Sequence, residues 1–315
     1  MIVSVCADKG SPGVTDLATV LGLVWPAGCV VLEADCAGAD LPFRMRHADG
    51  DRLLDAQPSV LSLAADSRGP LPDGGLARYA QPTTLGVPVV PGALSAEGFG
   101  PMARLWPRIA DVAATSDSTT IADLGRYQPG NVAAPVGRAS TALLLLARPD
   151  LAGLYHLRDR VSELAASLGD PGQERSPVAV VVRARPGVAG RAAVEQVRQV
   201  LEAAGSAVPV AGLFAEDPAA IALLREGVAS RRLLGSDLVR SVQALTETVL
   251  GWWPQLLGDA GLAASVQAAS SSAATPAAAV PSRLARLRGS AGRVPATPDV
   301  PGPVAGAPAL GQVSA

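Results

Sequence analysis

The sequence contains very little lysine, cysteine and histidine, and each shortage narrows what the protein can be. Lys9 is the only lysine among 26 basic residues, so a compact ammonium is kept at one position and arginine stands at all the others. There are three cysteines and two histidines, with no spacing typical of a metal site. No disulfide framework is indicated, and we expect a reduced, cytoplasmic setting.

Strong net charge and long apolar runs are also missing. The net charge is −2, so no basic field draws the chain to nucleic acid, and we expect no direct binding to it. The longest apolar stretches, such as residues 141–147, are far shorter than the ~20 residues that span a bilayer. No basic segment precedes an apolar run at the N-terminus. The sequence therefore predicts neither a transmembrane helix nor a secretory signal.

The chain does contain an alternation of short β-prone runs and longer helical patterns. The runs predict buried strands at residues 1–7, 29–34, 85–90, 143–147 and 178–182. The helical patterns cover residues 17–24, 96–114, 149–168, 189–204 and 236–257. Because parallel strands need such crossover helices, we expect an α/β fold in residues 1–257. It is a doubly wound, mainly parallel sheet with helices on both faces.

The composition changes at residue 258. Alanine, serine, proline and glycine dominate residues 258–315, so this segment is predicted to be a disordered tail. Residues 283–288 form a short basic and apolar patch within it. The patch is too short for stable membrane anchoring alone. We expect an inert or protein-binding tail, with weak peripheral contact to a membrane as the alternative.

The most informative stretch is the glycine-rich segment 8–16, which lies between the first predicted strand and the first predicted helix. In that setting backbone N–H groups and the helix dipole can hold an anion. The sequence therefore predicts a phosphate-binding loop there.

This segment resembles the variant Walker A loop of the MinD/ParA group of P-loop ATPases, a resemblance that Lys9, Gly10, Gly13 and Thr15 carry. It implies a site for ATP and Mg²⁺ in a protein that forms a homodimer when nucleotide is bound. Lys9 would reach the partner's nucleotide, and the Thr15 hydroxyl would hold Mg²⁺. The residues of the nucleotide cradle would be Gly10, Ser11, Pro12, Gly13, Val14, Thr15 and Asp16.

Two acids that follow predicted strands extend the resemblance. The segment 33–41 is similar to the family's switch segment, and Asp35 takes the place of the acid that positions the attacking water. A carboxylate that simply caps the loop after the strand is an equal alternative for Asp35. The run 118–126 is similar to Walker B, and Asp123 is the acid expected beside Mg²⁺. Residues 208–217 resemble a family element near the base, whereas Arg183 stands where relatives have an adenine-reading asparagine.

The loop departs from the family's pattern at two important positions. Val14 replaces the second lysine, which removes the charge that matters most for hydrolysis. Asp16 adds an acid, and two unit charges about 4 Å apart interact by roughly 4 kcal/mol at an effective dielectric near 20. One reading of Asp16 is that it complements the helix dipole. The other is that its carboxylate occupies the phosphate site itself.

Two functions follow from this combination. The first is a nucleotide-binding switch with weak or absent hydrolysis that acts in cellular positioning, namely septum placement, chromosome partitioning or assembly of secretion or pilus machinery. The second is a pseudo-ATPase scaffold that binds protein partners without nucleotide turnover. Lys9 and Thr15 favour the first. Val14, Asp8 and Asp16 favour the second.

Overall fold

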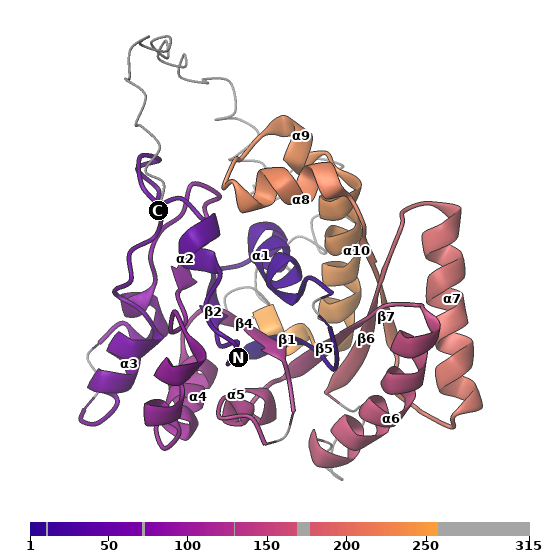
Figure 1. Ribbon diagram of the computed structural model, residues 1–315, viewed down its shortest axis with the longest axis horizontal. Coiled ribbons are helices and arrows are strands. Elements are labelled where there is room, and N and C mark those ends of the chain that lie inside the picture. The colour runs from indigo at the N-terminus through magenta and orange to yellow at the C-terminus, as the bar shows by residue number, and fades with distance from the viewer. Residues whose placement is uncertain (11, 71–72, 129, 169–176, 258–315) are drawn as a thin grey trace, which may run out of the picture.

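The computed structural model describes residues 1–10, 12–70, 73–128, 130–168 and 177–257 (Figure 1). Within that part, seven strands form one sheet in the order β3-β2-β4-β1-β5-β6-β7, and all neighbours pair in parallel. The expected doubly wound α/β fold is confirmed. The predicted tail, 258–315, lies outside the described residues. The strands are β1 (Ile2–Ala7), β2 (Cys29–Glu33), β3 (Val89–Val90), β4 (Thr119–Arg126), β5 (Ala142–Ala147), β6 (Val178–Ala184) and β7 (Val210–Ala215).

Helices cover both faces of this sheet, as Figure 1 shows. The helices are α1 (Val14–Val24), α2 (Leu41–Arg44), α3 (Val60–Asp66), α4 (Trp106–Thr115), α5 (Ala134–Arg138), α6 (Leu151–Leu168), α7 (Val188–Ala203), α8 (Pro218–Arg225), α9 (Arg231–Leu234) and α10 (Asp237–Trp252). Short 3₁₀ turns are η1 (Gly75–Tyr79), η2 (Ala96–Gly98), η3 (Gly100–Met102) and η4 (Pro254–Leu257). The helices α1, α8, α9 and α10 pack on one face, and α3 to α7 pack on the other.

The central strand β1 contributes to both hydrophobic cores, because successive side chains of a strand point to opposite faces. Val3 and Val5 enter the core beneath α1 and α10, whereas Ile2 and Cys6 enter the core on the opposite face. All six residues of β1 are buried. A strand buried on both sides needs a nearly continuous apolar sequence, which explains why residues 1–7 are so apolar.

The direction of winding reverses at β1, and this reversal positions the site. The chain first adds β2, β3 and β4 on one side of β1, and then adds β5, β6 and β7 on the other. In open α/β sheets, ligands bind at the carboxyl ends of the strands where such a reversal occurs. The loop between β1 and α1 lies at this point, with the ends of β4 and β5 on either side of it.

Two predicted helices and one predicted strand are shorter than expected, and proline or glycine explains each case. Residues 96–114 contain two 3₁₀ turns before α4 begins at Trp106, because glycine and proline interrupt the pattern. The last helix ends at Trp252, since the residue before Pro254 is driven out of the helical conformation. The strand predicted at residues 85–90 is reduced to the two residues of β3. Pro88, directly before β3, accepts a hydrogen bond from the Val31 amide but has no N–H to donate, which limits the pairing.

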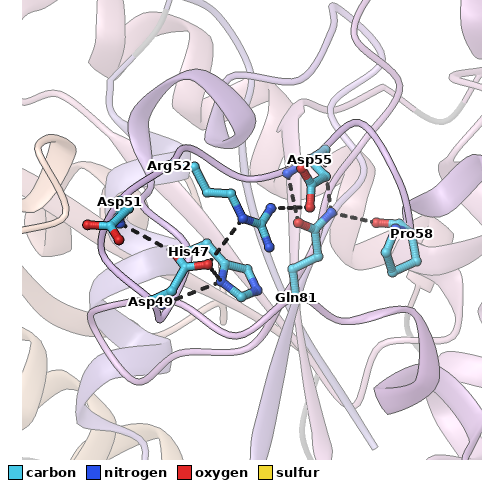
Figure 2. Close-up of polar contacts among 7 residues, drawn as sticks. All are labelled: His47, Asp49, Asp51, Arg52, Asp55, Pro58 and Gln81. Carbon is cyan, nitrogen blue, oxygen red and sulfur yellow. Dashed lines mark hydrogen bonds and ion pairs between the residues drawn. The ribbon is translucent and has the colours of Figure 1, made fainter.

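A polar network replaces regular structure in the connection between α2 and α3 (Figure 2). Arg52 pairs with Asp49 and Asp55, and His47 lies 2.9 Å from the Asp49 carboxylate. The buried Gln81 side chain accepts from the Asp55 amide and donates to two carbonyl oxygens in the same connection. His47 therefore takes part in fixing this connection.

Candidate functional site

The loop that connects β1 to α1 turns sharply at two glycines. Gly10 has φ 77° and Gly13 has φ 95°, backbone conformations that residues with a Cβ rarely adopt. Helix α1 begins directly after Gly13, and the Leu17 amide donates to the Gly13 carbonyl. The first amides of α1 are therefore available to an anion. Ser11 lies outside the described residues.

A cavity of about 490 Å³ opens beside this loop. It is bounded by the loop and the start of α1, by the segment after β2, and by the segment after β4. Its polar and charged lining residues include Thr15, Asp16, Asp35, Arg44, Arg126, Asn131 and Arg225. The structure thus brings the first turn of α1 and Asp35 to one cavity.

Asp123, on β4, is completely buried and lies near Thr15 and Asp35, although it is not among the residues that line the cavity. Its Oδ1 accepts a hydrogen bond from the Gly125 amide, and its Oδ2 has no hydrogen-bond partner among the described residues. Burial raises the pKa of Asp123 to about 7, and the nearby Thr15 hydroxyl opposes that rise. A buried carboxylate oxygen without a partner is costly unless a ligand or ion completes it.

These residues fit a magnesium ion. Thr15 offers a hydroxyl oxygen and Asp123 a carboxylate oxygen, which are ligands that Mg²⁺ accepts together with water and phosphate. Within the described residues no cluster of three or more histidine, cysteine, aspartate or glutamate side chains could hold a metal. Mg²⁺ at this site would therefore take its remaining ligands from water and a bound phosphate.

Asp35 lies close to the turn after β4. Its Oδ1 accepts a hydrogen bond of 2.9 Å from the Ala37 amide, which is the capping arrangement that the sequence also allowed. Its carboxyl group occupies the space that a side chain at Gly125 would need. Burial raises the pKa of this half-buried carboxyl. Asp35 is therefore both a loop cap and a polar group on the cavity wall.

Glu33, at the end of β2, has a structural role, because it binds backbone amides of two neighbouring segments. It is only 1% exposed, and its carboxylate accepts backbone hydrogen bonds from Asp40, Leu41 and Gly92. Burial raises its pKa to about 6, although those three amides oppose the rise. Glu33 fixes the segment that carries Asp35 and joins it to the residues after β3.

Val14 and Asp16, the two positions at which the loop departs from the family's pattern, supply no cation. The Val14 side chain is buried in the apolar core beneath α1. Asp16, which is 3% exposed, accepts two hydrogen bonds from Arg225 of α8, at 3.0 Å from Nε and 2.7 Å from Nη2. The charge of Asp16 is therefore matched by an arginine from the other end of the chain.

Two further pairs hold the start of the loop against α6. Asp8 accepts a 2.6 Å hydrogen bond from Arg160, which also binds Glu163. The Lys9 ammonium lies 3.4 Å from Nε2 of His156. Both Lys9 and His156 line a second cavity, of about 270 Å³, whose other walls are mainly apolar. Lys9 thus lies against α6 and lines a different cavity from the one that Thr15 and Asp35 line.

Arg183 occupies the end of β6, where relatives would carry an adenine-reading asparagine. Its Nη1 donates to the carbonyl oxygen of Pro12, and its guanidinium covers the face of Gly13. The same group lies above the Phe214 ring and 3.6 Å from the Glu216 carboxylate. Burial lowers the pKa of Arg183. An arginine therefore closes the side of the loop that faces β6 and β7.

Nothing in the sequence indicates that Arg225, Arg160 or His156 would reach the loop. Arg225 and Asp16 are 209 positions apart, and Arg225 lies in an ordinary helical pattern. Only Arg183 carried a signal, because it follows a run of valines at a predicted strand end. Asp217 caps the N-terminus of α8, because its side chain accepts a hydrogen bond from the Ala220 amide, and Pro218 follows it as the first residue of the helix.

The fold has close counterparts among solved structures. The cell division ATPase MinD of Pyrococcus furiosus superposes with a TM-score of 0.58 at 18% identity, covering 80% of this chain and 98% of that one. A ParA family ATPase from Chlorobium tepidum superposes with a TM-score of 0.59 at 17% identity, covering 78% of this chain and 98% of that one. The septum site-determining protein MinD of Pyrococcus horikoshii, complexed with Mg-ADP, superposes with a TM-score of 0.54 at 18% identity. The match covers 79% of this chain and 95% of that one.

The chain has the MinD/ParA fold. The likeness spans nearly the whole length of those proteins, so the described domain matches a complete MinD/ParA unit. Identities of 17–18% show the fold alone. No family model matches the sequence, and no curated protein matches it. No helix in the described part of this MinD/ParA fold is long and apolar enough to cross a bilayer.

Proposed function

We propose that this protein is a nucleotide-binding switch of the MinD/ParA kind, with weak or absent hydrolysis. The observation that carries the proposal is the buried Oδ2 of Asp123, which has no hydrogen-bond partner among the residues that the structure describes and lies near the Thr15 hydroxyl at the start of α1. A buried carboxylate and a hydroxyl beside free helix amides suit a magnesium-bound phosphate better than they suit an empty core. The ligand that fits is ATP with Mg²⁺.

Each residue has a role in this proposal. The amides of Gly10, Gly13 and the first turn of α1 hold the phosphates, with Ser11, Pro12, Val14 and Asp16 completing the cradle. Thr15 and Asp123 hold Mg²⁺, which neutralises phosphate charge when bound. Asp35 positions water, and Lys9 reaches the nucleotide of the partner in a homodimer. The direction of Lys9 supports that last role, because its ammonium lies on the α6 side of the loop.

Weak or absent hydrolysis follows from the missing lysine. Phosphoryl transfer depends on positive charge close to the transferred group, and the Val14 side chain is buried in an apolar core. Position 14, where the family's pattern has its second lysine, therefore offers no positive charge to a bound phosphate. The nucleotide would then act as a conformational signal more than as a substrate.

The cellular process is positioning: septum placement, chromosome partitioning, or assembly of secretion or pilus machinery. The names of the structural neighbours, a cell division ATPase and a septum site-determining protein, support the first of these. We place the protein in the cytoplasm, with peripheral contact to the membrane as the weaker alternative. Direct binding to nucleic acid is not part of the proposal.

A scaffold without nucleotide turnover is the second candidate. The pairing of Asp16 with Arg225 favours it, since a neutralised carboxylate in the first turn of α1 attracts no further anion. Such a protein would keep the fold and its partner surfaces and would bind other proteins in one fixed state.

Light scattering separates the two candidates. The molar mass of the full chain is measured without nucleotide, with ADP and with ATP, always with Mg²⁺, and phosphate release is followed in the same samples. A dimer that forms only with ATP, with slow or undetectable phosphate release, supports the switch. A mass that is the same in all three samples supports the scaffold.

A further inference from the structure

The Asp16 carboxylate is surrounded by positive groups at the start of α1. Arg225 binds both of its oxygens side-on, a paired geometry that is strong and directional. Hydrogen bonding to Asp16 raises the pKa of Arg225, so the guanidinium remains charged. The positive end of the α1 dipole lies on the same side, because Asp16 is in the first turn.

Gly13 allows this cluster to approach the loop backbone. The Asp16 Oδ2 lies 3.2 Å from the position that a Cβ on Gly13 would take, and the Arg183 guanidinium reaches the same position. Side chains on helices lean toward the N-terminus, which directs Asp16 back over the loop. The Asp16 carboxylate of α1 and the Arg183 guanidinium of β6 thus converge on the glycine that ends the loop, and Arg225 of α8 binds the carboxylate.

The groups around Asp16 are those that a phosphate would need. Two arginines and the amides of a helix N-terminus form a general anion site. Arg225 uses Nε and Nη2 on Asp16 and is still partly exposed, and Arg183 Nε makes no hydrogen bond among the described residues, although it lies 3.6 Å from the Glu216 carboxylate. The anion that occupies this arrangement is the chain's own carboxylate. Asp16 also lines the 490 Å³ cavity together with Thr15 and Asp35.

We propose that Asp16 is a built-in competitor of nucleotide phosphate, which Arg225 holds over the loop and which sets the nucleotide affinity. The inference rests on the proposed function, because it requires the loop to be a phosphate site. An incoming phosphate must displace the Asp16 carboxylate or tolerate its charge. Asp16 and Val14 then act in the same direction, one by adding a negative charge and the other by omitting a positive one.

Two substitutions test the proposal, because they are expected to change affinity in opposite directions. Asp16→Asn keeps the size of the side chain and removes its charge, which frees Arg225 and should tighten Mg·ATP binding by about tenfold or more. Arg225→Ala leaves the carboxylate beside the loop without its partner, which should weaken binding. Both affinities are measured by calorimetric titration of the full chain.

Controls separate competition from a structural ion pair. Glu195→Gln breaks the exposed pair with Arg198 on α7 and should leave Mg·ATP affinity unchanged. A pair that only joins α1 to α8 would make both test variants less heat-stable without shifting their affinities in opposite directions. If the Asn variant does not fold, as judged by circular dichroism, the smaller Asp16→Ser takes its place in the titration.

The outcomes distinguish the inference from the proposed function. Tighter binding by Asp16→Asn together with weaker binding by Arg225→Ala supports the competitor. Equal or weaker binding by folded Asp16→Asn, when the wild type does bind Mg·ATP, overturns the competitor and leaves the proposed function standing. Absence of binding in both the wild type and folded Asp16→Asn overturns both, because a loop without its competitor should accept phosphate.

Discussion

The ammonium of Lys9 lies 3.4 Å from Nε2 of His156, across a cavity that neither Asp35 nor Asp123 lines. The only lysine of the chain therefore contacts α6 and lines a different cavity from the one that Thr15 and Asp35 line. This position of the Lys9 ammonium is consistent with a contact to the nucleotide of a partner subunit and not to the chain's own nucleotide.

Lys9→Ala is expected to abolish the nucleotide-dependent dimer without altering the stability of the monomer. Exposed polar contacts contribute little to stability, so the free energy of unfolding should change by less than about 0.5 kcal/mol. The dimer is followed by light scattering with Mg·ATP, and unfolding is followed with urea. His156→Ala is the matched variant: it removes the neighbour and should preserve the dimer. A dimer that persists in Lys9→Ala would rule out a role for Lys9 in the partner's site.

The raised pKa of Asp123 predicts a pH-dependent stability. Because its folded pKa is about 7 and its unfolded pKa is the ordinary value near 4, the folded state binds the extra proton. That contribution to stability is fully present below about pH 4 and is lost as the pH rises through about 7. Without nucleotide, the wild type should therefore lose more stability between about pH 5 and pH 8 than Asp123→Asn does.

Urea unfolding at the two pH values checks this expectation. Each pKa unit is worth about 1.4 kcal/mol, so the difference between wild type and Asp123→Asn should change by a few kcal/mol over this range. Parallel pH profiles for the two proteins would show that Asp123 titrates normally and that its burial is not costly.

Restoring the loop should strengthen nucleotide binding. Val14→Lys combined with Asp16→Thr supplies the missing cation and removes the added acid, so ATP affinity should rise above that of either single variant. Val14→Lys alone buries an ammonium where Val14 is 6% exposed, which should cost about 1–3 kcal/mol of stability. Calorimetry of the three variants tests the gain. An unchanged affinity in the double variant would mean that the loop is not a phosphate site.

Glu33→Gln should affect stability more than nucleotide binding. An amide offers one acceptor oxygen where the carboxylate accepts from three backbone amides, so at least one buried N–H is left facing a donor. The expected loss is about 1–3 kcal/mol. Thermal unfolding measures it, and Asp35→Asn, which replaces a partly exposed cap, should lose less. A larger loss for Asp35→Asn would reverse the structural roles assigned to the two acids.

The fold could be predicted from the sequence because its signals are local. The apolar runs that became β1 and β5 are buried on both faces, and such strands are recognisable without knowledge of their neighbours. The same holds for the loop, whose glycines lie between a strand and a helix. Local reasoning was less successful at residues 96–114, where apolar spacing suggested one helix and the prolines and glycines divided it.

The charged surroundings of the loop could not be predicted, because they depend on pairs far apart in the chain. Asp16 was correctly placed at the start of α1, but whether its charge would be paired depended on Arg225, which only tertiary packing brings to it. The sequence shows only that Arg183 stands where relatives have an adenine-reading asparagine. In the structure its guanidinium donates a hydrogen bond to the loop backbone. Spacing along a sequence carries no information about such contacts.

Calorimetric titration of the wild type with ATP, with and without Mg²⁺, tests the central claim most directly. We predict saturable binding that requires Mg²⁺ and is lost in Asp123→Asn, because the buried carboxylate and Thr15 hold the ion that carries the phosphates. Absence of binding, or binding of equal strength without Mg²⁺ and in Asp123→Asn, would contradict it.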